Sequence, residues 1–217
     1  MEENLNRRKF LASIGALSGG LLLSACTSSK PHTHSPTTST TVAPNSFKSL
    51  NYAALMVSIE NVLIYSYSSI KVQASNFAIP SCILALLDVA ISDHQNHANN
   101  WNSFLQQNHQ KPLSNLDPSL HSMVNTQLAA LPKLSSINFQ TQAMGIVSQL
   151  EQICAATYQN CISYKLSASE VGLSMQTLGV ELQHVAVLEF FLGRYPILGT
   201  FSTTDGARPL SDFNGGF

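Results

Sequence analysis

From Phe47 onward, apolar residues recur at intervals of three and four positions, the spacing that places side chains on one face of an α-helix. The pattern predicts four long helices, at residues 48–75, 81–108, 137–166 and 169–193. Pro80 precedes the second helix, and Ser167 or Ser169 is suited to cap the fourth. No stretch alternates β-branched and polar residues as a half-buried strand would. The sequence therefore predicts an all-α fold.

The connections between the expected helices differ in length. Only a few residues separate the first helix from the second and the third from the fourth, which makes each pair antiparallel neighbours. Residues 109–136 form a much longer link that contains Pro112, Pro118 and Pro132, with a brief helix expected near 119–130. This order predicts an antiparallel four-helix bundle with a long crossover between helices 2 and 3.

The first 26 residues have the features of an export signal. Arg7 and Arg8 are followed by Lys9-Phe10-Leu11 and then by a weakly apolar run, which is shorter than the roughly 20 residues that a membrane span needs. The segment resembles a twin-arginine signal, with Asn6 in place of the usual hydroxyl residue. An uncleaved membrane anchor is the alternative interpretation.

The end of this signal, Leu23-Ser24-Ala25-Cys26, resembles a bacterial lipobox, in which the cysteine is acylated and becomes the first residue of the mature chain. We therefore expect an extracytoplasmic lipoprotein that is anchored to the bacterial membrane through Cys26. Residues 27–46 contain 14 Ser, Thr or Pro residues out of 20, a composition typical of a flexible tether. The bundle then covers residues 47–193, and the glycine-containing residues 194–217 are expected to form an irregular tail.

The amino-acid composition of the chain disfavours one class of function and favours self-association. Charged residues make up 11% of the chain, against roughly 25% in an average protein. The net charge of −1 gives no basic surface for nucleic acid, so a nucleic-acid partner is not expected. A surface so poor in charge favours a homo-oligomer.

Three cysteines remain after Cys26, and an odd number argues against a disulfide framework. Cys154 and Cys161 lie too far apart on one helix to bridge each other. We expect Cys82, Cys154 and Cys161 to be small buried thiols, although a bridge from Cys82 to one of the other two remains open.

Acidic residues are scarce in the predicted bundle, so their positions are informative. The five glutamates are Glu60, Glu151, Glu170, Glu181 and Glu189. Three of them interrupt apolar stripes near the middle of a helix, where the side chain should be buried; these are Glu60, Glu151 and Glu181. The second helix carries His94 and His97 on its apolar stripe, and the fourth carries His184. We expect Glu170 to support a helix start, Glu189 to be solvated, and the stripe residues Tyr67 and Tyr158 to pack in the core.

Buried carboxylates need partners, and a metal ion is a partner that several acids and imidazoles can share. Glu181 and His184 are three residues apart on one helix, so both side chains can bind the same ion. The alternative is a buried salt-bridge cluster between the glutamates and protonated histidines. The residues thus predict either a metal site or an ionic cluster in the bundle core.

This arrangement resembles the ferritin-like superfamily, whose bundles hold paired iron or manganese ions with one Glu from each of two helices and a Glu-x-x-His from each of the other two. The resemblance covers about residues 47–193, and residues 180–188 (VELQHVAVL) are similar to the last helix of exported bacterial ferritin-like proteins. It implies the metal ligands Glu60, His97, Glu151, Glu181 and His184. His94 stands where the second-helix glutamate is expected, and the neighbouring Asp93 is the alternative for that role.

The resemblance implies a cofactor of one or two ions of iron or manganese, with zinc as a further candidate, held by Glu60, His94, His97, Glu151, Glu181 and His184. It also implies an oxidoreductase that acts on peroxide, oxygen or ferrous iron. A second interpretation is a module that binds metal without catalysing a reaction. A structural or partner-binding lipoprotein with a degenerate, metal-free site is the third, and the histidine at position 94 favours it.

Overall fold

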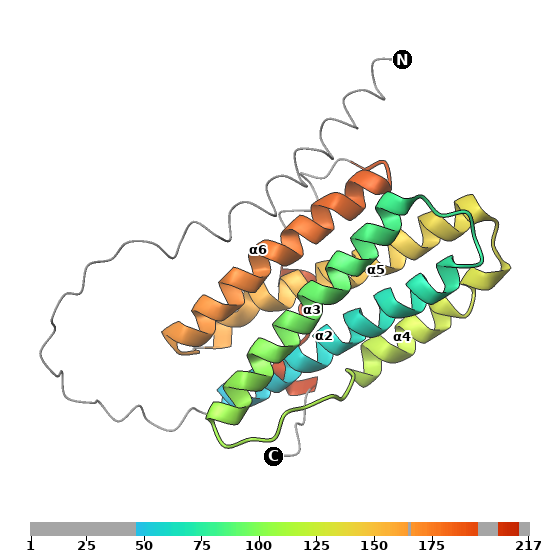
Figure 1. The fold of residues 1–217 in the computed structure, drawn as a ribbon. Coiled ribbons are helices and arrows are strands. Elements are labelled where there is room, and N and C mark those ends of the chain that lie inside the picture. The colour runs from blue at the N-terminus through green and yellow to red at the C-terminus, as the bar shows by residue number, and fades with distance from the viewer. Residues whose placement is uncertain (1–46, 165, 195–203, 213–217) are drawn as a thin grey trace, which may run out of the picture. The chain divides into compact units, whose positions relative to one another are not determined.

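The computed structural model describes residues 47–164, 166–194 and 204–212 (Figure 1). These residues form five α-helices and four short 3-10 segments, with no strand among them, so the predicted all-α class is confirmed. The predictions for residues 1–46, including Arg7, Arg8 and Cys26, lie outside the described part of the chain.

The helices begin and end close to the predicted positions. Their bounds are α2 Phe47–Ala74, α3 Ser81–Gln107, α4 Pro118–Leu128, α5 Ser136–Gln159 and α6 Ala168–Phe191. The prediction of one helix over 137–166 is wrong at its end, because α5 stops at Gln159 and the chain continues as the 3-10 segment η2 (Asn160–Tyr164). The Asn160 side chain donates a hydrogen bond to the Tyr164 hydroxyl at 3.0 Å, which stabilises this tighter turn.

The long helices lie side by side (Figure 1). α2 packs along α3, and α5 packs along α6, while α4 lies against α2 and α5. Residues 75–80 join the first pair and residues 160–167 join the second, so the members of each pair run antiparallel. The core between the helices is formed by apolar side chains, among which the largest fully buried ones are Trp101, Tyr52, Tyr67, Tyr158 and Phe139.

Helix starts are fixed by local hydrogen bonds. Ser167 accepts a hydrogen bond from the Glu170 backbone, and the Glu170 side chain accepts one from the Ser167 backbone at 2.8 Å. This reciprocal capping box confirms both the predicted cap and the role of Glu170 at the start of α6. Ser135 caps α5 with a single hydrogen bond, which its side chain accepts from the backbone N–H of Asn138.

Among the described residues, one helix is long and apolar enough to cross a membrane, namely Lys48–Ala74 within α2. However, 72% of its most apolar window is buried inside the protein, and Glu60 lies near its middle. These properties are those of a core helix.

A short C-terminal segment forms hydrogen bonds with the helices. This segment contains two 3-10 segments, η3 (Thr204–Gly206) and η4 (Leu210–Asp212). Both lie in the region that was predicted to be an irregular tail. Between them, the backbone N–H of Arg208 donates to Thr157 Oγ1 at 2.9 Å. The guanidinium of Arg208 donates to both carboxylate oxygens of Asp117, the residue that caps α4.

Replacing Arg208 with alanine should therefore lower the free energy of unfolding by about 2 kcal/mol, because Asp117 would lose a charged donor at a mostly buried position. Urea denaturation measures this loss. The control is K71A, which removes a surface ion pair with Asp88 and should cost less than about 1 kcal/mol. Equal effects of the two substitutions would show that the C-terminal segment does not contribute to stability in this way.

Candidate metal centre

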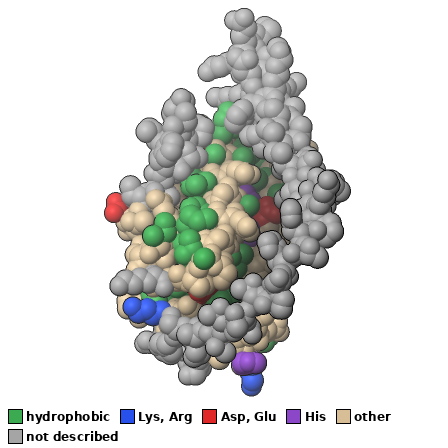
Figure 2. Space-filling model, turned by 90° about the vertical axis from the view of Figure 1, so that its left-hand side faces the viewer, with side chains coloured by type: hydrophobic (Ala, Val, Ile, Leu, Met, Phe, Trp, Pro, Cys, Tyr) green, Lys and Arg blue, Asp and Glu red, His purple; other side chains and the backbone are tan. Residues whose placement is uncertain are grey.

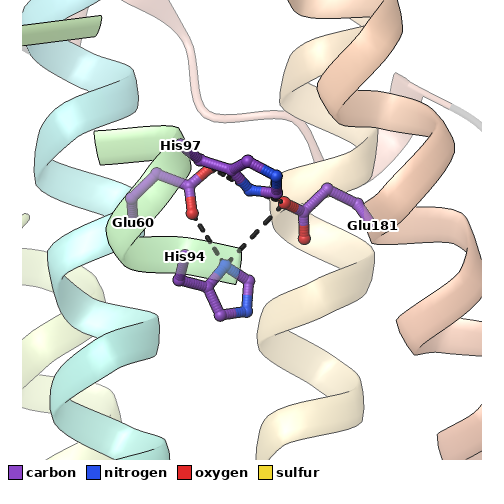
Figure 3. A group of neighbouring side chains, drawn as sticks. All are labelled: Glu60, His94, His97 and Glu181. Carbon is purple, nitrogen blue, oxygen red and sulfur yellow. Dashed lines mark hydrogen bonds and ion pairs between the residues drawn. The ribbon is translucent and has the colours of Figure 1, made fainter. Parts of the chain in front are cut away.

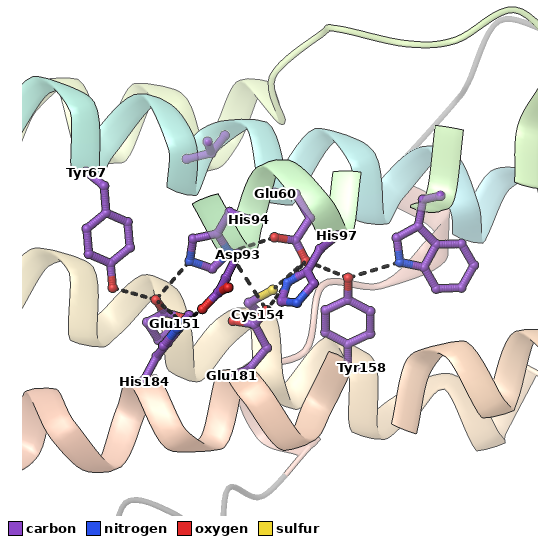
Figure 4. Close-up of polar contacts among 12 residues, drawn as sticks. Glu60, Tyr67, Asp93, His94, His97, Glu151, Cys154, Tyr158, Glu181 and His184 are labelled. Carbon is purple, nitrogen blue, oxygen red and sulfur yellow. Dashed lines mark hydrogen bonds and ion pairs between the residues drawn. The ribbon is translucent and has the colours of Figure 1, made fainter. Parts of the chain in front are cut away.

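All six residues predicted as ligands converge between the helices (Figures 3 and 4). Their exposed fractions range from 0% to 7%. α3 contributes a pair spaced three residues apart, and α6 contributes another, so each pair projects from one helix face. The six residues are Glu60 of α2, His94 and His97 of α3, Glu151 of α5, and Glu181 and His184 of α6.

The first group of candidate ligands comprises Glu60, His94, His97 and Glu181 (Figure 3). One ligand atom from each of these residues lies within 4.8 Å of the others. His94 Nδ1 lies 2.7 Å from Glu60 Oε2, and His97 Nδ1 lies 2.8 Å from Glu181 Oε1. Both imidazoles therefore present Nδ1 to the same small volume.

The second group comprises His94, Glu151, Glu181 and His184, and it meets the same 4.8 Å limit. Here His94 Nε2 lies 3.0 Å from Glu151 Oε1, and His184 Nδ1 lies 3.3 Å from the same oxygen. His94 and Glu181 belong to both groups, so the two groups form one continuous cluster.

Several buried atoms of this cluster have no hydrogen bond within the described structure. They are His97 Nδ1, His184 Nδ1, Glu151 Oε2 and both carboxylate oxygens of Glu181. Although neighbouring atoms are close, they are not aligned as donor and acceptor, and leaving such groups unpaired costs about 1–3 kcal/mol each. Two ligands bound about 2.1 Å from one ion at roughly tetrahedral or octahedral angles lie about 3–3.5 Å apart. The distances between imidazole nitrogens and carboxylate oxygens in the cluster range from 2.7 to 3.8 Å and include this spacing. The cluster therefore fits a metal ion, although its geometry does not identify the metal.

The choice between Asp93 and His94 follows from the orientation of α3. His94 is fully buried and faces both groups, whereas the Asp93 side chain is 34% exposed and lies at the edge of the cluster. Asp93 Oδ2 lies 3.2 Å from His184 Nε2, so the Nδ1 atom of that imidazole is left facing Glu151. A carboxylate on the outer nitrogen of a metal-binding imidazole fixes its tautomer and orientation.

Two tyrosines that were expected to pack in the core also form hydrogen bonds with the candidate ligands (Figure 4). Tyr67 of α2 donates its hydroxyl proton to Glu151 Oε1 on α5 at 2.5 Å, and Tyr158 of α5 donates to Glu60 Oε1 on α2 at 2.5 Å. Trp101 Nε1–H donates in turn to the Tyr158 oxygen at 3.0 Å. Each tyrosine lies seven residues after a glutamate on the same stripe, a spacing that is visible in the sequence. These bonds hold two carboxylates in fixed orientations.

Shifted pKa values describe how charge is distributed in the cluster when it holds no metal. Burial alone would raise the pKa of Glu60, but the hydrogen bond from His94 and the nearby charges of His94 and His97 outweigh it and lower the pKa to about 2. Burial opposes the charged form of His94, yet the charge of Glu151 and the hydrogen bonds to Glu151 and Glu60 raise its pKa well above its ordinary value. Burial and then the charge of Glu60 raise the pKa of Glu181 well above its ordinary range. The metal-free cluster thus favours a charged His94 beside ionised Glu60 and Glu151 and disfavours the charged form of Glu181.

These shifts predict how the stability of the metal-free protein depends on pH. The lowered pKa of Glu60 contributes stability above its ordinary pKa of 4.5, and this is lost as the pH falls toward about 2. The raised pKa of His94 contributes stability below its ordinary value of 6.5, and this is lost as the pH rises through the higher folded value. The raised pKa of Glu181 also costs stability as the pH rises above its ordinary value of 4.5. With a chelator present, the urea midpoint should therefore be highest near about pH 4.5 and should decline on both sides. A midpoint that rises from about pH 6 to pH 8 would contradict this charge assignment.

Two smaller expectations are wrong. Cys82 is exposed, while Cys154 and Cys161 are buried as expected, and all three are free thiols. Glu189 is 5% exposed rather than solvated, because Ser148 of the adjacent α5 donates a hydrogen bond to its Oε1 at 2.7 Å and Arg194 also contacts it. Glu189 belongs to neither group of candidate ligands.

Comparison of this chain with protein-family models, with curated proteins and with solved structures finds no match.

Proposed function

We propose that this protein is an exported, membrane-tethered ferritin-like protein that binds one or two transition metal ions in the core of a four-helix bundle. The observation that carries the proposal is the convergence of six buried residues with nitrogen and oxygen donors from all four long helices, several of whose donor atoms have no hydrogen bond. Such convergence costs stability unless a cation satisfies the donors.

The ferritin-like topology is part of the proposal. Two antiparallel pairs, α2 with α3 and α5 with α6, are joined by residues 108–135, which include α4. Ligands come singly from α2 and α5 and in pairs from α3 and α6, which is the distribution that the superfamily uses.

The donor set favours particular metals. Three carboxylates and three imidazoles suit iron and manganese, and they also suit zinc. Bound iron or manganese would supply redox chemistry toward peroxide, oxygen or ferrous iron. The chain itself orients the donors, because Tyr67 and Tyr158 fix two carboxylates and Asp93 fixes His184. Buried apolar helices around the donors exclude bulk water.

The Asp93 contact gives a specific prediction. D93N should weaken metal binding by about 10–100-fold, because the amide no longer holds the outer nitrogen of His184 with a charged acceptor. Equilibrium dialysis against Mn²⁺ measures the change. The control D88N alters an exposed aspartate of the same helix and should leave the affinity unchanged. An unaltered affinity in D93N would mean that Asp93 does not position this ligand.

The proposed location rests on the sequence motifs at Arg7, Arg8 and Cys26. If the chain is exported, cleaved and acylated, the mature protein should begin at a lipid-modified Cys26 and should be recovered with the membrane. Mass spectrometry of the mature protein tests this, and C26S should release the chain from the membrane. Recovery of unmodified Cys26 within an intact N-terminus would favour the uncleaved anchor instead.

Self-association is the proposed protein partnership. Hydrophobic and uncharged atoms cover most of the described surface on the face shown in Figure 2. Large hydrophobic side chains that are exposed include Val72, Val89, Ile137 and Ile162. Light scattering of the detergent-solubilised chain should show an assembly larger than one chain, and a strictly monomeric protein would contradict this part of the proposal.

Enzymatic activity is tested directly by adding peroxide to the iron-loaded full chain. We expect consumption of peroxide that is lost in E181Q. The alternative function is a structural or partner-binding lipoprotein with a metal-free site, which is favoured by the position of His94 between Glu60 and Glu151. Metal binding without turnover would leave a binding module, whereas a chain that binds no metal would favour the structural alternative.

A further inference from the structure

His94 is placed so that its two ring nitrogens face different groups of candidate ligands (Figure 4). Nδ1 lies 2.7 Å from Glu60 Oε2 in the first group, and Nε2 lies 3.0 Å from Glu151 Oε1 in the second. The ring of Tyr67 stacks against the imidazole, with centroids 5.5 Å apart and an angle of 27° between the planes. The imidazole is therefore held between the two groups.

An imidazole and a carboxylate differ in the number of metal ions that each can bind. A carboxylate offers one oxygen to each of two ions, whereas a neutral imidazole has one free lone pair because its other nitrogen carries a proton. Glu181 is the carboxylate common to both groups, and both of its oxygens lack a hydrogen bond. Glu181 can serve two ions at once, but neutral His94 can serve only one.

We propose that His94 binds a single metal ion, so that the centre has one half with four protein donors and one half with three. This inference rests on the proposed metal-binding function. The proton of the ring stays on the other nitrogen and is donated to the carboxylate of the three-donor half. Both carboxylates that could accept it are already in place, since Glu60 Oε2 faces Nδ1 and Glu151 Oε1 faces Nε2. The first ion to bind takes His94, whichever half it enters.

The described residues around His94 offer no substitute donor for the incomplete half. Asp93 is directed at the outer nitrogen of His184, and its side chain is partly exposed. The Tyr67 hydroxyl donates to Glu151, and the Cys154 thiol lies 3.8 Å from Glu60 Oε1, where it is a donor to that oxygen. The second ion therefore binds with fewer protein ligands and with lower affinity.

A titration of the chelator-stripped full chain with Mn²⁺ tests this inference. The unaltered protein should bind two ions in separate steps, the first at least about tenfold tighter than the second. H94Q keeps a neutral side chain with hydrogen-bonding capacity, and it should lose the tight step. H97Q and H184Q each damage one half only, so each should keep one tight ion, because His94 then serves the intact half. H121Q is the matched control, because His121 of α4 lies outside both groups.

If H94Q folds poorly, a variant that is expected to gain affinity for the second ion provides an independent test. H94E supplies a carboxylate with two oxygens, and it should bind two Mn²⁺ ions with similar, tight affinities. Two equally tight ions in the unaltered protein, or a tight step that survives in folded H94Q, would overturn the inference while leaving metal binding intact. Absence of Mn²⁺ binding in both the unaltered chain and H94E would instead overturn the proposed function.

Discussion

Replacing Glu181 with glutamine should lower the affinity for both metal ions by at least about 100-fold while leaving the metal-free protein folded. Glu181 is the carboxylate that both ligand groups share, so its loss affects each ion. In the metal-free protein, burial and the charge of Glu60 raise the pKa of Glu181 and so favour its neutral form, and glutamine is close in shape to that form. The free energy of unfolding with a chelator present should therefore change by less than about 1 kcal/mol.

The matched control is E189Q, which changes a second buried carboxylate of α6 that lies in neither group. We expect E189Q to retain both ions. Metal affinity and urea denaturation, measured on the same preparations, separate loss of ligand from loss of fold. If E181Q bound metal as tightly as the unaltered chain, Glu181 would not be a ligand.

Replacing Glu60 with alanine should destabilise the metal-free protein by about 3–5 kcal/mol. Glu60 is fully buried, faces His94 Nδ1, and accepts the hydroxyl proton of Tyr158. Its removal leaves a charged imidazole without its carboxylate and a buried hydroxyl without its acceptor. Urea denaturation in the presence of a chelator measures the loss.

The companion variant E60Q separates charge from packing. Glutamine fills the same volume and still offers an oxygen to Tyr158, so a smaller loss than in E60A is expected. A loss below about 1 kcal/mol in E60A would show that the metal-free cluster does not depend on this carboxylate.

Much of the fold follows from the sequence because its helices are long and periodic. The interruption of apolar stripes by Glu60, Glu151 and Glu181 also revealed the buried cluster, since charged residues are scarce in this chain. On α3, α5 and α6 the stripe defines which face of the helix is buried, whereas α2 is buried on all sides over residues 51–60. The four helices together bring the six residues into one cluster.

Features that depend on contacts between helices could not be predicted in this way. Asp93 and His94 are adjacent, and only the rotation of α3 against its neighbours determines which of them faces the cluster. The bonds from Tyr67 to Glu151 and from Tyr158 to Glu60 depend on the relative height of α2 and α5. Glu189 was misplaced for the same reason, because its partner Ser148 belongs to a different helix.

Elemental analysis of the full chain, purified without chelator from a host that exports it, tests whether the buried cluster holds metal. We expect one to two transition metal ions per chain, as iron, manganese or zinc, with about two after exposure to excess metal. A folded chain that contains no transition metal and also fails to take up added Fe²⁺, Mn²⁺ or Zn²⁺ would contradict metal binding by this cluster. The buried glutamates and histidines would then be an ionic cluster that stabilises the fold.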